Sequence, residues 1–350
     1  MSTADDIHIC SFLPVPEAAL DRIRAVDPCI CLHSASLNLV RWMREPNHPE
    51  VDIAAAVAEA EEIRNRDQVW FTFFSGNLAC GAPALDWIAL ASAGTDQILR
   101  QPPEPHVRVT KMPGLAARVI AEWVLAFMLM DCKQMPRYLD NQRRAYWQRF
   151  VDATDPLTPR SLEGATVAII GYGAIGSEIA RLVSALGVRV IGIRRRAEAD
   201  GAPPPSAPAA VEAIWPPDRL HDVLGQADYS VLAVPLTDAT RKMIGEAEIA
   251  AMKPGAALIN IARGEVVDWP AQIAALRDGR LRACYTDVTS PEPLPDGHPD
   301  WDTPNLVITP HNSGLMPDYF GKAVDRFTDN LARYVRGEPL LDLVDREAGY

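Results

Sequence analysis

Residues 166–176 read TVAIIGYGAIG, an apolar run that passes into the pattern GxGxxG at Gly171, Gly173 and Gly176. A helical pattern over residues 174–186 follows, which is the context in which this motif binds a dinucleotide. Gly171 makes the tight turn, Gly173 lets the backbone approach a pyrophosphate, and Gly176 lets the helix pack on the strand. The helix N-terminus adds free N–H groups and a partial positive charge. The predicted dinucleotide loop comprises Gly171, Tyr172, Gly173, Ala174, Ile175 and Gly176.

The next predicted strand, residues 188–193, ends in three arginines, Arg194, Arg195 and Arg196. NAD-binding units place an acidic residue here, about 20 residues after the first glycine, to bind the ribose 2′-OH. Arg194 stands 194 − 171 = 23 residues after Gly171, and no carboxylate occupies that place. Guanidinium groups suit a 2′-phosphate. We therefore expect NADP(H) to be preferred, with NAD(H) possible; the alternative is a solvated basic turn.

Short apolar runs alternate with helical patterns on both sides of this motif. The expected strands cover residues 7–13, 68–74, 85–92, 107–111, 165–170, 188–193, 229–234, 257–260, 282–287 and 306–309, with a short strand inside 202–217. The expected helices cover 16–26, 51–64, 174–186, 269–277 and 319–336, and further helices are expected in the intervals between the later strands. Residues 115–147 are helical with a break or kink at Pro136. This alternation predicts an α/β protein with parallel sheets, and 350 residues suffice for two domains.

The composition excludes several classes of protein. A net charge of −12, from 34 Lys+Arg and 46 Asp+Glu, argues against nucleic acid or an anionic membrane as a partner. The most apolar run, 119–130, is shorter than the ~20 residues of a membrane span, and the acidic N-terminus lacks the basic region of a signal peptide. Six scattered cysteines without a CxxC predict reduced, buried thiols in a cytoplasmic protein. No metal site is expected, because no HExxH, paired CxxC or carboxylate cage occurs.

Three downstream segments carry side chains that can bind an anion and move a proton: NIARGEVVD with Arg263, DVTSPEPLP with Glu292, and TPHNSG with His311. Arg263 offers a planar fork, and His311 can give or take a proton near neutral pH. Glu292 would orient His311 and favour its protonated form. A capping histidine or a surface arginine would explain each residue alone, but not all three in this order.

Together with the glycine loop and VPLT at 234–237, these segments resemble the D-isomer-specific 2-hydroxyacid dehydrogenase family. The resemblance covers most of the chain and implies an NAD(P)-dependent oxidoreductase that reduces a glyoxylate- or hydroxypyruvate-like keto acid to the D-2-hydroxy acid. It implies that Asp287 holds the nicotinamide carboxamide. It also implies a substrate carboxylate between Arg263 and the backbone N–H groups of Ala93, Gly94 and Thr95. Further cofactor contacts are implied at Val234, Pro235, Thr240, Ile261, Ala262 and Ser313.

The resemblance also implies an architecture and an assembly. Two Rossmann-like or flavodoxin-like domains with parallel sheets would hold the active site in the cleft between them. A discontinuous substrate-binding domain of residues 1–112 and 316–350 would enclose an NAD(P)-binding domain of residues 113–315. A homodimer is expected, with residues 136–147 contributing, and Trp147 and Met316 are candidates for the pocket lining.

Two alternatives remain at this point. Formate dehydrogenases share the architecture, but that branch carries Gln at the position of Glu292. A nucleotide-sensing, corepressor-like protein would keep the fold and bind the nucleotide without turning over a keto acid. The substrate side chain is left open, because no single residue reports the size of the pocket.

Overall fold

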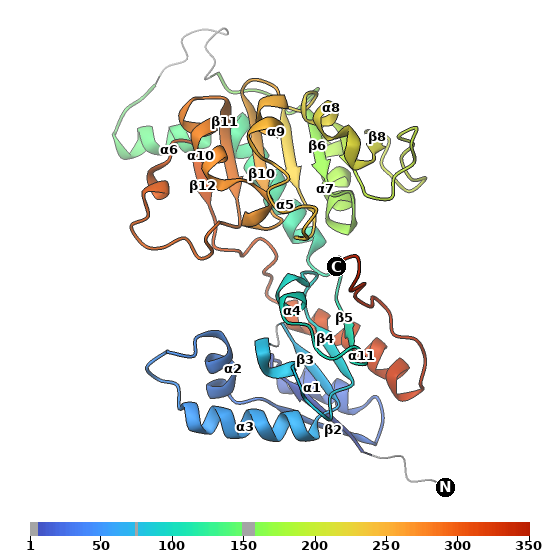
Figure 1. The fold of residues 1–350 in the computed structure, drawn as a ribbon. Coiled ribbons are helices and arrows are strands. Elements are labelled where there is room, and N and C mark those ends of the chain that lie inside the picture. Colours follow the sequence, from blue (N-terminus) through green and yellow to red (C-terminus); the bar gives the residue numbers. More distant parts are fainter. Residues whose placement is uncertain (1–5, 74–75, 149–157) are drawn as a thin grey trace. The chain divides into compact units, whose positions relative to one another are not determined.

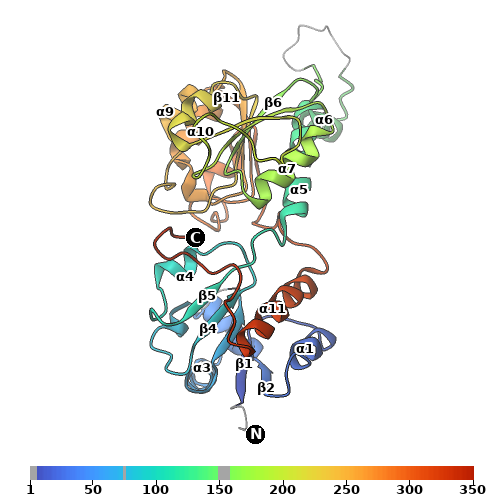
Figure 2. The same ribbon diagram turned by 90° about the vertical axis from the view of Figure 1, so that its right-hand side faces the viewer.

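The computed structural model describes residues 6–73, 76–148 and 158–350, and the chain divides into two compact units. Unit 1 comprises Met1–Leu115 and Met316–Tyr350, and unit 2 comprises Ala116–Leu315. Each unit holds one sheet flanked by helices (Figures 1 and 2). All pairings between the named strands are parallel. The predicted fold class, two α/β domains with parallel sheets, is therefore confirmed.

Unit 1 is a five-stranded sheet with helices on both faces. Its strands stand in the order β2 (Ile30–Ser34), β1 (Ile7–Ser11), β3 (Val69–Thr72), β4 (Trp87–Leu90) and β5 (Arg108–Thr110). Its helices are α1 (Glu17–Arg24), α2 (Leu37–Arg44), α3 (Ile53–Arg66), α4 (Asp96–Arg100) and α11 (Tyr319–Val335), with a 3-10 turn at Gly76–Ala79.

Alternation along the strands of unit 1 sends neighbouring side chains to opposite faces. Trp70 joins the core beneath α2 and α3, whereas Phe71 joins the core beneath α1 and α11. Phe327 of α11 stacks on Phe71 and on Trp87, with ring centroids 4.4 and 5.3 Å apart. The last helix of the chain therefore completes the core of the unit that begins the chain.

Unit 2 is a seven-stranded sheet. Its strands stand in the order β12 (Leu306–Ile308), β11 (Leu281–Thr286), β10 (Ala256–Asn260), β9 (Tyr229–Leu232), β6 (Thr166–Ile170), β7 (Arg189–Ile193) and β8 (Val211–Trp215). Its helices are α5 (Ala117–Cys132), α6 (Met135–Arg143), α7 (Ala174–Ser184), α8 (Leu220–Leu224), α9 (Glu246–Ala251) and α10 (Trp269–Arg277). The strand order reverses between β6 and β9, and open α/β sheets bind ligands at such a switch point.

A buried charge network fastens α5 to this sheet. Asp131, near the end of α5, accepts hydrogen bonds from the hydroxyls of Tyr229 (2.7 Å) and Tyr285 (3.2 Å). It also accepts from the Arg282 guanidinium (2.9 Å). Burial raises the pKa of both tyrosines, and the neighbouring Asp131 carboxylate raises it further, so both hydroxyls remain donors.

The predicted elements are present with ends shifted by a few residues, but several details differ. β2, α2 and α4 are not among the predicted elements, and Phe74 of the predicted strand 68–74 lies outside the described residues. The helical run 115–147 is interrupted at Gln134, which is left-handed (φ 55°). Pro136 does not break a helix: it lies in the first turn of α6, where the missing N–H costs nothing.

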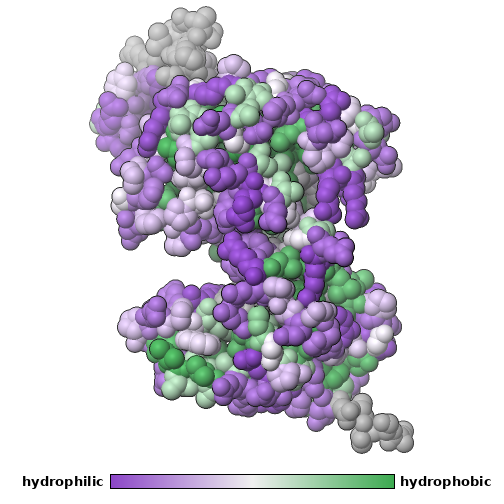
Figure 3. Space-filling view, in the orientation of Figure 1, coloured by the Kyte–Doolittle hydropathy of each residue, from purple (hydrophilic) through white to green (hydrophobic). Residues whose placement is uncertain are grey.

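The cysteine prediction was right in part. All six are free, but Cys29, Cys31 and Cys80 are half-buried, and only Cys10, Cys132 and Cys284 are buried. Hydrophilic side chains cover most of the face shown in Figure 3, with smaller hydrophobic patches such as the one over α2 and α3, where Leu37 and Ile53 are exposed. Within the described ranges, no helix is both long and apolar enough to cross a membrane.

Candidate active site

The glycine loop follows β6 at the switch point of the unit 2 sheet. Gly171 has a φ of 106°, and a Cβ there would lie 2.5 Å from the carbonyl oxygen of Ala233. A Cβ on Gly176 would lie 2.6 Å from the Gly171 oxygen. These two glycines are required for packing.

Gly173 differs from its neighbours, because nothing lies within 4 Å of the place where its Cβ would stand. It caps α7, whose first N–H groups have no acceptor inside the helix. This open backbone fits a pyrophosphate at a helix N-terminus. The Tyr172 side chain is buried and its N–H donates to Ile193. Neither the side chain nor the N–H of Tyr172 is therefore available to a cofactor. A contact through its remaining backbone atoms stays a prediction.

The three arginines lie beside this loop. The N–H groups of Gly171 and Tyr172 both donate to the carbonyl of Ile193, the last residue of β7. Arg194 comes next and donates its own N–H to Trp215 (2.9 Å). The side chains of all three arginines are exposed. A basic, solvent-facing segment thus adjoins the glycine loop.

The segment after β9 forms a compact turn. The Thr240 hydroxyl donates to the Pro235 oxygen (2.6 Å) and accepts from the Thr237 N–H (2.8 Å). The structure thus uses this hydroxyl to shape the turn that carries Val234 and Pro235. The predicted cofactor contacts of Val234, Pro235 and Thr240 remain predictions.

Glu292 and His311 are in direct contact. His311 Nδ1 lies 2.6 Å from Glu292 Oε1, and both side chains are partly exposed. Burial alone would raise the pKa of Glu292. The hydrogen bond and charge of His311, a backbone hydrogen bond from Thr289 and the charge of Arg263 together outweigh burial, so the pKa is lowered and the ionised carboxylate is favoured.

Arg263 is held between β10 and the Glu292 loop. Asn260 Nδ2 donates to the Arg263 carbonyl (3.0 Å), and its Oδ1 accepts from the Ala262 N–H (3.0 Å). At Gly264, a Cβ would stand 1.9 Å from the Thr289 carbonyl oxygen. Only glycine permits this approach, which brings Arg263 to the loop that carries Glu292.

Asp287 is buried at the end of β11 and organises the His311 loop. Its carboxylate accepts from the Thr309 hydroxyl and from the N–H groups of Asn312 and Ser313 (both 2.9 Å). Its carbonyl accepts from the His311 N–H (2.8 Å). His311 itself has a φ of 51°, so the loop holds it in a conformation that few side chains adopt. A contact between Asp287 and a carboxamide remains a prediction.

The remaining candidates were harder to judge from the sequence. Ile261, Ala262 and Ser313 are buried next to Arg263 and His311. Ala93, Gly94 and Thr95 lie in unit 1 after β4, where the buried Thr95 hydroxyl donates to the Gly349 carbonyl. Sequence reasoning missed Asn260, Gly264 and Thr309. The only local signal for them was their place within the NIARG and TPH segments.

Comparison with known proteins gives the family. Residues 125–313 match the family model "D-isomer specific 2-hydroxyacid dehydrogenase, NAD binding domain". A glycerate dehydrogenase of Methylorubrum extorquens is 32% identical over 266 residues, covering 73% of this chain and 78% of that protein. The chain belongs to the D-isomer-specific 2-hydroxyacid dehydrogenase family. The matched residues lie within unit 2, which therefore holds the NAD-binding domain of this 2-hydroxyacid dehydrogenase.

Two further relatives support this assignment. A glyoxylate reductase of Aeropyrum pernix is 30% identical over 286 residues, covering 79% of this chain and 82% of that protein. The solved D-isomer-specific 2-hydroxyacid dehydrogenase of Xanthobacter autotrophicus, in complex with NADPH and MES, is 25% identical with a TM-score of 0.78. It covers 99% of this chain and is itself covered completely. This 2-hydroxyacid dehydrogenase thus shares its fold with family members along nearly its whole length.

Proposed function

We propose that this 2-hydroxyacid dehydrogenase uses NADPH to reduce a small keto acid of the glyoxylate or hydroxypyruvate kind to the D-2-hydroxy acid. The observation that carries the proposal is the 2.6 Å contact between His311 and Glu292, with Arg263 close enough to lower the pKa of that carboxyl. The similarity to a glycerate dehydrogenase and to glyoxylate reductases supports the substrate class.

Each of the three residues has a separate task in this proposal. The guanidinium of Arg263 binds the substrate carboxylate and polarises the keto oxygen. Glu292 holds Nδ1 of His311, which leaves Nε2 to protonate the developing alkoxide as general acid. In the oxidative direction the same nitrogen takes the proton back. The bound nicotinamide cofactor supplies the hydride.

NADP(H) is the proposed cofactor, with NAD(H) possible. Arg194, Arg195 and Arg196 are exposed beside the glycine loop, where an NAD-binding unit would carry a carboxylate. The open backbone at Gly173 suits the pyrophosphate. Asp287 fixes the His311 loop in this proposal and, as the family resemblance implies, also meets the carboxamide.

The proposal also includes substrate contacts from unit 1, an assembly and a cellular compartment. As the family resemblance implies, the backbone N–H groups of Ala93, Gly94 and Thr95 in unit 1 would donate to the substrate carboxylate. A homodimer would cover the exposed apolar side chains in and after α6: Met135, Tyr138, Leu139, Tyr146 and Trp147. Six free cysteines fit a reducing compartment such as the cytoplasm.

The test is NADPH oxidation with glyoxylate, hydroxypyruvate and phenylpyruvate. We expect turnover with at least one of them, and His311→Ala should lower kcat by about 10²–10⁴-fold, the usual range for a general acid. NADPH binding should be nearly unchanged. His221→Ala is the matched control, because His221 also pairs with a glutamate, Glu248, at 2.9 Å on the exposed surface. Tight nucleotide binding without turnover of any keto acid would favour a nucleotide sensor instead.

A further inference from the structure

Four side chains of types that can bind a metal, His8 and Cys10 on β1 and Cys31 and His33 on β2, share one face of these neighbouring strands in unit 1. The sequence reads DIHIC at 6–10 and CICLH at 29–33. β1 and β2 pair in parallel, with His8 opposite Cys31 and Cys10 opposite His33. Side chains alternate along a strand, so the intervening residues, such as Ile7 and Ile9, face the α1–α11 core instead. The face with the metal-ligating side chains is the one toward α3.

The inner group on this face, Cys10, His33 and Asp67, already contains a cation. Arg66 Nε donates to Asp67 Oδ1 (3.0 Å), and Arg66 Nη2 lies 2.7 Å from His33 Nε2. A guanidinium at this position supplies the positive charge that the buried Asp67 needs. This group is therefore satisfied without a metal.

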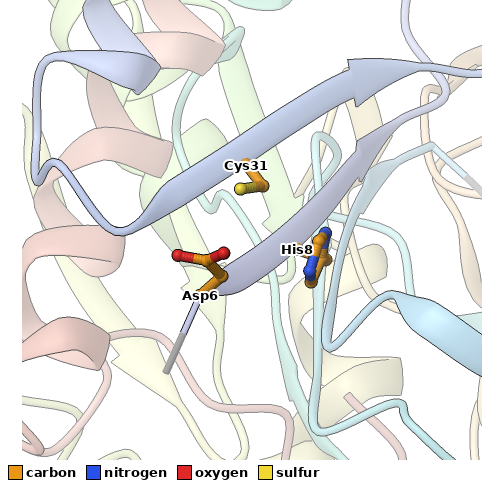
Figure 4. A group of neighbouring side chains, drawn as sticks. All are labelled: Asp6, His8 and Cys31. Atoms are coloured by element: carbon orange, nitrogen blue, oxygen red, sulfur yellow. The ribbon is translucent and has the colours of Figure 1, made fainter. Parts of the chain in front are cut away.

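The outer group differs in this respect. The ligand atoms of Asp6, His8 and Cys31 lie within 4.8 Å of one another (Figure 4). Within the described part of the chain, none of these three side chains makes a hydrogen bond or an ion pair. Asp6 is exposed, and His8 and Cys31 are half-buried. The three groups are therefore accessible and converge without a partner that explains the convergence.

We propose that Asp6, His8 and Cys31 bind a zinc-type divalent cation at the edge of the unit 1 sheet, with the fourth coordination position left to water. Thiolate, imidazole and carboxylate are the donors that Zn²⁺ takes in four-coordinate sites, whereas Mg²⁺ and Ca²⁺ take oxygen. With Zn–S and Zn–N bonds of about 2.3 and 2.0 Å, the side chains must close in by roughly 1 Å. The coordinating thiol of Cys31 releases its proton to solvent.

The consequence of this site is stability rather than catalysis. The cation would join β1 to the edge strand β2, both in unit 1. Arg263, Glu292 and His311 all belong to unit 2. Binding to the folded state alone stabilises that state by mass action. We therefore expect the metal to raise the thermal stability of unit 1 and to leave keto acid reduction unchanged.

The test uses the full-length protein, stripped by a chelator under reducing conditions. Titration with Zn²⁺ against a chromophoric chelator should give one tightly bound ion per chain, and Co²⁺ should give thiolate-to-metal charge-transfer absorption. Cys31→Ser and Asp6→Asn should weaken Zn²⁺ binding by at least about tenfold, since even outer-shell partners cost that much. Cys80→Ser, which alters a half-buried cysteine elsewhere in unit 1, should leave it unchanged.

Several results would overturn the proposal. One is equal Zn²⁺ affinity in the wild type and the Asp6→Asn variant, whose exposed substitution does not threaten folding. Another is a cobalt spectrum without thiolate absorption. A third is an equal loss of affinity in Cys80→Ser. Keto acid turnover, measured in parallel, reports on unit 2 and so keeps a failed metal site distinct from a failed enzymatic function.

Discussion

Glu292 lies against His311 with a lowered pKa, so its charge as well as its position should matter for turnover. A carboxylate beside an imidazole favours the protonated ring. Glu292→Gln keeps the shape and removes the charge, so we expect a kcat for reduction lower by at least about tenfold. Steady-state rates of reduction by the variant and the wild type measure this, and an unchanged kcat would contradict it.

Arg194 tests the preference for the 2′-phosphate. The Arg194 side chain is exposed and adjoins the glycine loop through Ile193. A charge-assisted hydrogen bond contributes about 1.5–3 kcal/mol, so Arg194→Asp should raise the KM for NADPH by about tenfold or more. The KM for NADH should change little. Arg189→Ala is the control: it lies on the same strand but at its start, paired with Glu212 (2.7 Å). A wild-type preference for NADH would refute the cofactor assignment.

The turn between β6 and α7 separates two uses of glycine. In Gly173→Ala the new methyl group would stand in open space, so the unfolding free energy should change by less than about 0.5 kcal/mol. The Kd for NADPH should rise at least about tenfold, because the methyl group would occupy the place where the pyrophosphate approaches the backbone. Gly171→Ala meets the Ala233 carbonyl and a φ of 106°, so it should destabilise unit 2 by about 1–3 kcal/mol. Denaturant unfolding and nucleotide titration distinguish the two. Unimpaired NADPH binding by Gly173→Ala would mean that no phosphate approaches there.

At the scale of whole elements, periodicity predicted most of what the structure contains. The buried strands of unit 2 are continuous apolar runs, and the glycine motif in the sequence predicts both β6 and α7. β2 escaped prediction because its sequence, ICLHS, places cysteine and histidine at the positions that face α3. The helix break at Gln134 was not predicted, because the residue with the left-handed backbone is not a glycine and so gives no signal in the sequence.

The candidate active site could likewise be predicted only in part from the sequence. Arg263, Glu292 and His311 stand in sequence segments that could be interpreted locally, and the structure brings His311 onto Glu292. The contact of Gly264 with Thr289 and the three donors to Asp287 join residues about 20 or more positions apart. No local pattern encodes such contacts, because they depend on how neighbouring strands end in the folded sheet.

For the whole molecule, the decisive feature is that unit 1 is built from both ends of the chain. Residues 316–350 supply α11, and the chain passes into unit 2 after Leu115 and returns at Met316. Unit 2 is continuous in sequence and has its own hydrophobic core. The two cores share no residue. A substitution in one core should therefore lower the stability of that unit first.

Phe327→Ala tests this division. Phe327 is fully buried and stacks on Phe71 and Trp87, so its truncation should cost unit 1 about 3–5 kcal/mol. Amide exchange should then quicken in β1, β3 and β4 while β6 and β10 stay protected, and NADPH affinity should hold. Asp131→Ala is the reciprocal variant. It leaves the buried Arg282 guanidinium without its carboxylate partner and should lower the unfolding free energy of unit 2 by about 3–5 kcal/mol. Equal loss of protection in both units from either variant would mean that the chain unfolds as one cooperative body, because separate cores lose protection separately.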